Sequence, residues 1–257
     1  MPVPSRRPHC FLDAPSVIAF AHRGGAIEAP ENTLAAFHSA ARLGYTHFET
    51  DVHLTADGVV VAFHDASVDR TTSGKGRIAT HRWKDLEQLL VDDCEPIPRM
   101  EELFEAFPEA FFNIDVKSNA VVEPLLALIS RMHAHDRVCI GSFSKRRLNQ
   151  VRAVTEGTLA TSASPGEVLQ ALTHGYLPKM SEPLAPVALQ IPMTFLKLPI
   201  ATQRLVDAAH EAGMHVHVWT IDDVHQVETL LDMGVDGIMT DRPAMLKEVY
   251  KARGLWA

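Results

Sequence analysis

Cysteine is scarce in this chain, with Cys10, Cys94 and Cys139 as its three examples among 257 residues. Their number is odd and their spacing fits no metal-binding motif, which argues against a disulfide framework and against a thiolate zinc site. Long apolar runs are also missing, because no stretch reaches the roughly 18 residues of a membrane span. We therefore expect a soluble protein with no transmembrane segment, and the cytoplasm as its location.

Positive charge is in short supply as well. The chain has 24 Lys and Arg against 32 Asp and Glu, which gives a formal net charge of −8. That balance argues against nonspecific binding to nucleic acid or to anionic headgroups as the main activity. An anionic substrate would have to meet a local group of cations. We therefore expect a small-molecule partner and no nucleic acid, and the sequence assigns no oligomeric state.

Length and apolar content favour one domain spanning residues 1–257, since 46% of the residues are hydrophobic. Short apolar strands alternate with amphipathic helical stretches, such as 201–213 and 223–234, which is typical of α/β proteins with a parallel sheet. Eight such units favour a closed barrel over an open sheet. The predicted strands are 17–21, 47–53, 111–117, 137–143, 158–162, 188–192, 215–220 and 237–240.

The region from about residue 55 to 100 interrupts this alternation. Asp57 and Gly58 predict a turn, and residues 59–63 read as a further short strand. We interpret the region as a small insertion after the second barrel strand.

Carboxylates gather at the ends of two predicted strands. Side chains two residues apart in a strand share a face, so Glu49 and Asp51 point the same way, and Asp115 lies near the end of a later predicted strand. Polar residues at the carboxyl ends of barrel strands form the functional rim of such folds. An all-oxygen set suits a hard cation such as Mg²⁺ or Ca²⁺. Taken alone, these acids are more often capping or salt-bridge groups, and the interpretation as metal ligands depends on the histidines nearby.

Two histidines follow apolar strands at the same end of the predicted barrel. His22 comes after residues 17–21, and His64 after residues 59–63. Imidazole exchanges a proton near neutral pH, and phosphodiester cleavage requires one group to activate the nucleophile and another to protonate the leaving oxygen. We interpret His22 and His64 as a catalytic pair beside the predicted metal ligands Glu49, Asp51 and Asp115.

Three further residues are candidates for substrate binding. Arg23 and Lys117 could neutralise the non-bridging oxygens of a phosphate, or could form salt bridges to the carboxylates instead. Trp219, at the end of a predicted strand, could contact an apolar or glycerol moiety, or belong to the core.

The ordered motifs resemble those of the glycerophosphodiester phosphodiesterase family over nearly the whole chain. The resemblance implies a TIM (β/α)₈ barrel with a small insertion after the second strand, and hydrolysis of deacylated phospholipids to sn-glycerol 3-phosphate and an alcohol. It also implies the metal and acid–base roles given above. The motifs are His22-Arg23-Gly24, Pro30-Glu31-Asn32-Thr33, Glu49-Thr50-Asp51-Val52-His53, Asp57-Gly58, His64-Asp65, Asp69-Arg70-Thr71-Thr72, Asp115-Val116-Lys117, Trp219-Thr220 and Thr240-Asp241-Arg242-Pro243.

One position departs from the family pattern, and several alternatives stay open. Asp115 stands where family members often have glutamate, so the identity of the ion is open between Mg²⁺ and Ca²⁺. The attacking oxygen could come from water or from a neighbouring substrate hydroxyl. A lysophospholipase D, which would need an apolar groove, and a non-catalytic barrel that binds a phosphorylated ligand are the alternative functions. The residues that could line such a groove, or belong to the core instead, are Phe63, Phe143, Met193, Phe195 and Trp219.

Overall fold

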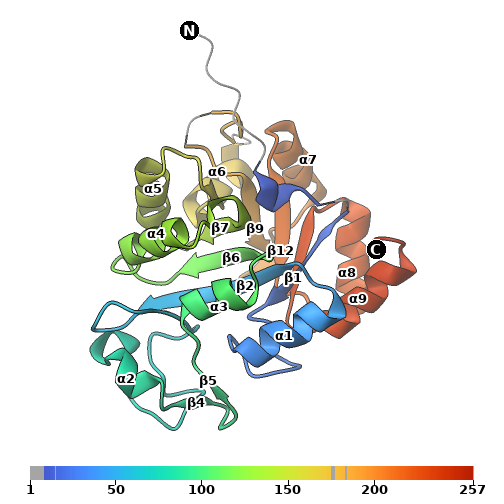
Figure 1. Cartoon of the computed structure of the whole chain (residues 1–257). Helices are drawn as coiled ribbons and strands as arrows, with labels where there is room; N and C mark the ends of the chain where they lie inside the picture. The colour runs from blue at the N-terminus through green and yellow to red at the C-terminus, as the bar shows by residue number, and fades with distance from the viewer. Residues whose placement is uncertain (1–8, 15, 175–176, 183, 257) are drawn as a thin grey trace.

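A computed structural model, describing residues 9–14, 16–174, 177–182 and 184–256, shows a barrel of parallel strands surrounded by helices (Figure 1). The sheet order is β8-β7-β6-β2-β1-β13-β12-β9, with every neighbouring pair parallel. The predicted eight-stranded α/β barrel is confirmed. Its strands are β1 (Ile18–His22), β2 (His47–Leu54), β6 (Phe111–Val116), β7 (Val138–Gly141), β8 (Ala160–Thr161), β9 (Ala188–Pro192), β12 (His215–Trp219) and β13 (Gly237–Thr240).

A helix follows each of these strands and packs on the outside of the barrel (Figure 1). Local sequence determines several helix ends. The side chains of Thr33, Thr202 and Asp223 accept hydrogen bonds at the starts of three helices, and Gly44 and Gly234 end two helices in the left-handed conformation. The helices are α1 (Leu34–Leu43), α3 (Met100–Ala106), α4 (Val122–Arg131), α5 (Lys145–Val154), α6 (Pro165–His174), α7 (Gln203–Glu211), α8 (Val224–Met233) and α9 (Pro243–Ala252).

The predicted strand at 137–143 is longer than the observed β7. Arg137 belongs to a 3-10 helix, η3 (His135–Arg137), and the Ser142 hydroxyl donates a hydrogen bond to the Val116 carbonyl instead of continuing the strand. The sequence pattern does not separate the strand from the turn that follows it, because Ser142 is buried like the strand residues before it.

The barrel is completed by a weak contact between its two end strands. β8 contains two residues, and its neighbour β9 is joined to this segment by one parallel bridge, between Ser162 and Ala188. Two flanking hydrogen bonds support the bridge, from Ala163 N–H to Ala188 O at 2.8 Å and from Val187 N–H to Thr161 O at 2.9 Å. The barrel is therefore nearly closed, and the pairing between β8 and β9 is its shortest strand pairing.

The predicted insertion lies between β2 and α3 (Figure 1). β3 (Val60–Ala62) pairs antiparallel with β2, so the segment is anchored to the barrel sheet. Its own apolar cluster includes Val61, Phe63 and Ile78. The other elements are η2 (Ile78–Thr80), α2 (Trp83–Leu86), β4 (Leu90–Val91) and β5 (Glu95–Pro96). The assignment of the whole chain, 1–257, to one domain stays a prediction, and its termini, 1–8 and 257, lie outside the described residues.

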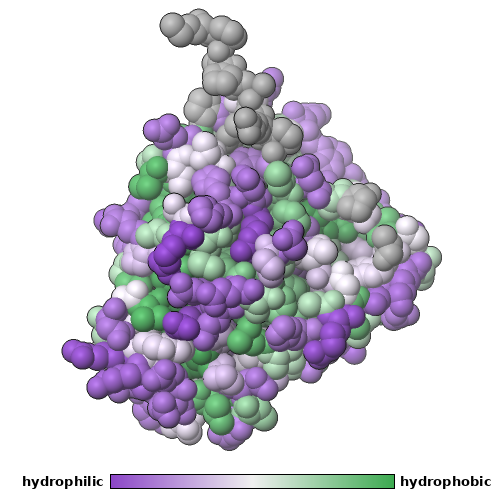
Figure 2. Space-filling model, in the orientation of Figure 1, coloured by the Kyte–Doolittle hydropathy of each residue, from purple (hydrophilic) through white to green (hydrophobic). Residues whose placement is uncertain are grey.

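Aromatic side chains fill the amino-terminal end of the barrel. Phe11, in η1 (Cys10–Leu12), is fully buried, and its ring lies 6.0 Å from that of Phe20 and 6.3 Å from that of Phe111. This end is therefore packed, which leaves the carboxyl ends of the strands as the open face. On the face shown in Figure 2, apolar and polar residues are interspersed. Within the described ranges, no helix combines the length and the apolar character needed to span a bilayer.

A buried arginine stabilises the junction between β8 and β9. Arg152, on α5, has 3% of its surface exposed, and it donates hydrogen bonds to the Thr161 hydroxyl at 2.8 Å and the Ser162 carbonyl at 2.8 Å. Its guanidinium also lies 2.7 Å from Glu167 of α6. Glu167 in turn accepts hydrogen bonds from the backbone and hydroxyl of Ser164, so one arginine links α5, the end of β8 and the start of α6.

We expect Arg152→Met to lower the free energy of unfolding by about 3–5 kcal/mol, because removing one partner leaves the other charge buried and unpaired. The double variant Arg152→Met/Glu167→Gln should recover part of that loss, since the unpaired charge is gone. Urea unfolding measures both. Equal stability of wild type and Arg152→Met would show that this network does not stabilise the barrel.

Candidate active site

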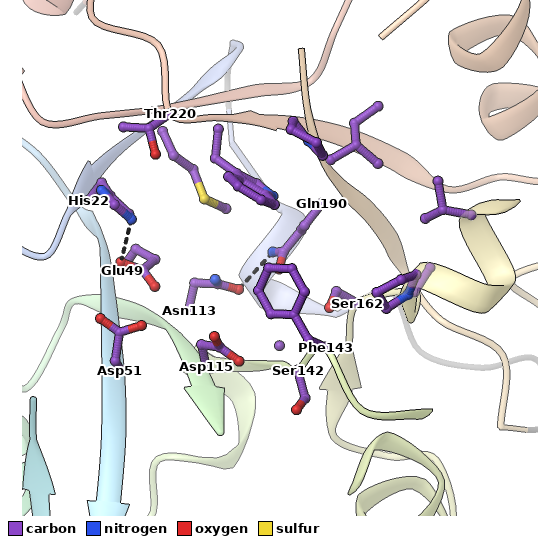
Figure 3. A pocket seen from close by; sticks show the side chains of 18 of the residues that line it. His22, Glu49, Asp51, Asn113, Asp115, Ser142, Phe143, Ser162, Gln190 and Thr220 are labelled. Carbon is purple, nitrogen blue, oxygen red and sulfur yellow. Dashed lines mark hydrogen bonds and ion pairs between the residues drawn. The ribbon is translucent and has the colours of Figure 1, made fainter. Parts of the chain in front are cut away.

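A cavity of about 550 Å³ opens at the carboxyl ends of the barrel strands (Figure 3). One side is polar and the other apolar. In Figure 3 His22, Glu49, Asp51 and Asp115 lie to the left, with Phe143 and Ser162 to the right. The polar lining includes His22, Arg23, Glu49, Asp51, His64, Asp115 and Lys117; the apolar lining includes Phe143, Pro165, Val168, Leu169, Leu172, Ile191, Phe195, Ile200 and Trp219. Every site residue that the sequence predicts lines this one cavity.

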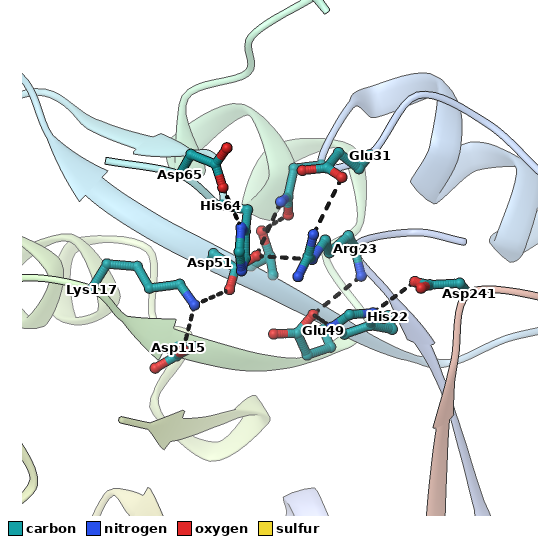
Figure 4. Close-up of polar contacts among 12 residues, drawn as sticks. His22, Arg23, Glu31, Glu49, Asp51, His64, Asp65, Asp115, Lys117 and Asp241 are labelled. Atoms are coloured by element: carbon teal, nitrogen blue, oxygen red, sulfur yellow. Dashed lines mark hydrogen bonds and ion pairs between the residues drawn. The ribbon is translucent and has the colours of Figure 1, made fainter. Parts of the chain in front are cut away.

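The three carboxylates come from two paired strands. Asp51 of β2 lies directly beside Asp115 of β6 in the parallel pairing of the two strands. Glu49 comes two residues before Asp51 in β2, so its side chain points to the same face. Lys117 Nζ lies 2.7 Å from Asp51 Oδ1 and 2.7 Å from Asp115 Oδ2 (Figure 4). Burial opposes the charge of Lys117, but these two acids outweigh it and raise its pKa. The lysine is therefore a counter-ion of the acidic cluster.

The acids at positions 49 and 51 differ in their surroundings. Burial and the nearby charge of Asp51 raise the pKa of Glu49, despite the opposing effect of His22. For Asp51, burial acts in the same direction, but Lys117 and Arg23 outweigh it and lower the pKa. Glu49 is therefore the carboxyl of the pair that more readily holds a proton in the absence of a further cation.

His22 is held between two carboxylates at the end of β1. Its Nδ1 lies 2.7 Å from Asp241 Oδ1, and its Nε2 lies 3.6 Å from Glu49 Oε2. Burial disfavours the imidazolium, but Glu49 and Asp241 overcome this and raise the pKa of His22. Asp241 is itself positioned by Asp222, which accepts a hydrogen bond from the Asp241 backbone at 2.7 Å.

His64 follows β3 and has a similar partner. Its Nδ1 lies 2.6 Å from Asp65 Oδ1, which orients the ring and leaves Nε2 as the nitrogen for proton exchange (Figure 4). Asp65 also accepts a hydrogen bond from Arg70 Nε at 2.6 Å, and this bond is the main reason that the pKa of Asp65 falls to about 2. Arg70 reaches further, to Glu31 Oε1 at 2.5 Å.

Arg23 lies in a tight turn after β1. Its φ of 52° is left-handed, and its backbone N–H donates to Glu49 Oε2 at 3.1 Å. Its guanidinium contacts Glu31 at 3.2 Å and Asp51 at 3.5 Å. The next residue, Gly24, cannot be replaced without rearrangement, because a Cβ there would approach Ala36 Cβ at 2.7 Å. The glycine brings the turn close to α1 and so orients Arg23 toward the acids.

The apolar wall includes some of the predicted groove residues and excludes others. Phe143, Phe195 and Trp219 line the cavity, with the rings of Phe143 and Trp219 edge to face at 5.8 Å. Phe63 lies instead in the core of the insertion and is 3% exposed. Met193 packs against the cluster around β9 and β12. Phe63 is therefore a core residue, and Met193, which is half-buried, is not among the residues that line the cavity.

The polar network contains residues to which the sequence analysis assigned no role. They are Glu31, Asn32, Asp65, Arg70 and Asp241. Asn32, with φ at 57°, donates to Asp51 Oδ2 at 3.1 Å and accepts from the Thr50 hydroxyl at 2.7 Å. All five stand within the motifs quoted for the resemblance, so their place in a motif was the available signal.

The donor chemistry of the acidic cluster fits a hard cation, since all its side-chain ligands are oxygens. Asp115 Oδ1 is buried and has no hydrogen-bond partner, which is the state of an oxygen available to an ion. In the conformation described, however, no three His, Cys, Asp or Glu side chains of the described residues surround a common ion position. The Lys117 ammonium contacts Asp51 and Asp115 and supplies the positive charge beside them.

Comparison with known proteins identifies the family. The sequence profile of the "Glycerophosphoryl diester phosphodiesterase family" matches residues 22–245. The chain belongs to this family. A relative from Mycobacterium tuberculosis, "Probable glycerophosphodiester phosphodiesterase 2", is 38% identical over 253 residues, covering 96% of this chain and 95% of the relative. The chain is therefore an enzyme, a glycerophosphodiester phosphodiesterase, and the alternative of a non-catalytic barrel is not needed.

Another sequence relative and two solved structures carry related but different names. The "Lysophospholipase D GDPD1" of Rattus norvegicus is 27% identical, over 88% of this chain and 84% of the relative. A phosphodiesterase of Oleispira antarctica, solved with the product sn-glycerol-3-phosphate, has a TM-score of 0.75 and 26% identity, covering 91% of this chain and 96% of that chain. A putative glycerophosphoryl diester phosphodiesterase from Silicibacter pomeroyi has a TM-score of 0.80 at 21% identity, over 97% and 99% of the two chains.

We expect Arg70→Gln to lower kcat by about 10- to 100-fold, since loss of its contacts to Asp65 and Glu31 would misplace both His64 and Arg23. Arg70→Lys should restore part of the activity, because lysine keeps the charge but cannot bridge two carboxylates with a planar fork. Steady-state kinetics measure both, and ¹⁵N NMR of the His64 ring reports the tautomer. The exposed Arg77→Gln, in the same insertion, is the control. Unchanged kcat and tautomer in Arg70→Gln would contradict the positioning role.

Proposed function

We propose that this phosphodiesterase cleaves glycerophosphodiesters to sn-glycerol 3-phosphate and an alcohol, with His22 and His64 as its acid–base pair. The observation that carries the proposal is that both histidines line one cavity and each has Nδ1 paired with a carboxylate, Asp241 or Asp65. A carboxylate on Nδ1 orients the ring, as proton transfer at Nε2 requires. The product bound to the Oleispira relative supports the choice of sn-glycerol 3-phosphate.

The reaction forms one P–O bond and breaks another. One histidine accepts the proton of the attacking hydroxyl, which belongs to water or to the neighbouring hydroxyl of the glycerol. The other donates a proton to the oxygen of the departing alcohol, so no alkoxide is released. Arg23 and Lys117 neutralise the non-bridging oxygens as their negative charge increases. Trp219 contacts the organic part of the substrate from the apolar side.

Glu49, Asp51 and Asp115 are the residues we propose to hold a divalent cation, Mg²⁺ or Ca²⁺. Such an ion would supply Lewis-acid polarisation of the phosphoryl oxygens. The unpartnered Asp115 Oδ1 and the all-oxygen donor set support this assignment. Lys117 Nζ already lies within 2.7 Å of two of these acids, so an ion and the ammonium would share the same negative charge.

A second function, that of a lysophospholipase D, is favoured by one specific observation. About half of the cavity is lined by aliphatic and aromatic side chains, including Leu169, Ile191 and Phe195. A deacylated substrate has no apolar part to cover this wall, whereas an acyl chain does. The rat relative named as a lysophospholipase D supports the same possibility for this chain.

We expect His22→Gln and His64→Gln each to lower kcat on glycerophosphocholine by about 10²- to 10⁴-fold, with a smaller change in KM, because proton transfer is lost and the phosphate contacts remain. Release of sn-glycerol 3-phosphate is the measurement, and the exposed His225→Gln is the matched control. Lysophosphatidylcholine, tested in parallel, separates the two substrate classes. Activity retained in the double variant His22→Gln/His64→Gln would exclude this mechanism.

We expect Asp115→Asn to weaken binding of Ca²⁺ or Mg²⁺ by at least about tenfold, because it removes one charged ligand. Isothermal titration calorimetry of the metal-free protein measures this directly, without dependence on turnover. Asp207→Asn, on the exposed face of α7, removes the same charge far from the cavity and should bind the ion like wild type. Equal affinities for all three proteins would place the ion elsewhere, and wild-type protein that binds neither ion would exclude the site.

A further inference from the structure

A short hairpin beside the cavity displays large apolar side chains to solvent. It consists of β10 (Thr194–Phe195) and β11 (Leu198–Pro199), which pair antiparallel just after β9. Phe195 is 61% exposed, Leu196 81% and Leu198 67%. Contiguous exposed apolar side chains on a soluble protein mark an interaction site.

The backbone conformation of the hairpin turn disfavours the residues found there. Leu196 has a φ of 49° and Lys197 a φ of 67°, the pattern of a turn that favours Asn, Asp or Gly at both positions. A leucine here opposes both the backbone preference and the preference of apolar side chains for the interior. Two local rules are broken at one residue, which is typical of a functional site.

The exposed apolar surface continues from the hairpin into the cavity. Phe143 is 66% exposed and Leu169 is 59% exposed, and both line the cavity, as Phe195 does. We call Phe143, Leu169, Phe195, Leu196 and Leu198 the apolar rim. A protein partner seated on the apolar rim would cover the cavity mouth, whereas a lipid surface would supply substrate through it.

Unpaired cations flank the apolar rim although the chain as a whole is acidic. Lys145 and Arg146 follow Phe143 at the start of α5, and Lys197 forms the hairpin turn; all three are exposed. Among the residues that the structure describes, no carboxylate forms an ion pair with any of them. Headgroup phosphates would complement these charges, while the leucines enter the acyl boundary.

We propose that the apolar rim docks on a lipid surface, with Leu196 and Leu198 inserted, so that an acyl-bearing phosphodiester passes from that surface along the apolar wall to the histidines. The docking rests on the geometry of the rim, and the delivery of substrate rests on the proposed function. This arrangement explains why the apolar wall of the cavity reaches solvent on one side.

The test compares three proteins. The rim variant is Leu196→Asp/Leu198→Asp, which changes no cavity-lining residue, and aspartate is tolerated at a positive φ. The matched control is Ala153→Asp/Val154→Asp, the same charge change on exposed positions at the far end of α5. Each protein is sedimented with vesicles of phosphatidylcholine and phosphatidylglycerol. Each is also assayed on dissolved glycerophosphocholine and on lysophosphatidylcholine carried in the vesicles.

We expect wild type and control to bind the vesicles and the rim variant to bind at least about tenfold more weakly, since two inserted leucines are lost. The rim variant should keep its rate on dissolved glycerophosphocholine and lose rate on the vesicle-borne lipid. The first substrate thus tests the proposed function independently of the hairpin.

Two results would overturn the docking proposal. One is wild-type protein that hydrolyses glycerophosphocholine but does not sediment with vesicles. The other is a wild-type dimer that the rim substitutions convert to a monomer in light scattering, which would assign the rim to contact between copies. Vesicle binding without hydrolysis of either substrate would support docking and count against the proposed function instead.

Discussion

Buried negative charge at the mouth of the barrel is the constraint around which the rest of the site is arranged. Glu49, Asp51 and Asp115 are each less than a tenth exposed, and carboxylates held in such a place require counter-charge or hydrogen-bond donors. Lys117 contacts Asp51 and Asp115, and Arg23 contacts Glu49 through its backbone N–H and Asp51 through its guanidinium. The left-handed turn at Arg23 and the close approach at Gly24 follow from this requirement, because they bring the donors within reach.

The insertion is part of the site because a second series of ion pairs connects it to the barrel. Arg70 joins Asp65, which orients His64, to Glu31, which contacts Arg23. One guanidinium from outside the barrel therefore links a group suited to proton transfer with a group suited to phosphate binding. Hydrogen bonds to two carboxylates in a fixed fork are a geometry that arginine provides and lysine does not. The segment after β2 is thus part of the active-site scaffold.

The side of the barrel around β8 and β9 is held together by a different buried ion pair. β8 is short, and its junction with β9 relies on the buried Arg152, which binds the strand end and the start of α6 together. Part of the apolar wall lies next to this junction, because Val168 and Leu169 of α6 line the cavity. A polar half, linked by ion pairs, and an apolar half with a minimal strand contact therefore meet in one cavity. This division matches a substrate that has a charged phosphodiester and an organic group attached to it.

The sequence by itself determined the barrel and the residue types of its site. Apolar strands alternating with amphipathic helices specify a parallel sheet, and two-residue periodicity places Glu49 and Asp51 on one face, because these patterns follow from local backbone geometry. Only the tertiary structure decided how the barrel ends meet, which acids pair with Lys117, and that Asp241 orients His22 from 219 positions away along the chain. It also decided that Phe63 is core while Phe195 is exposed. These outcomes depend on contacts between distant segments, and a one-dimensional pattern of apolar and charged residues carries no information on which segments meet.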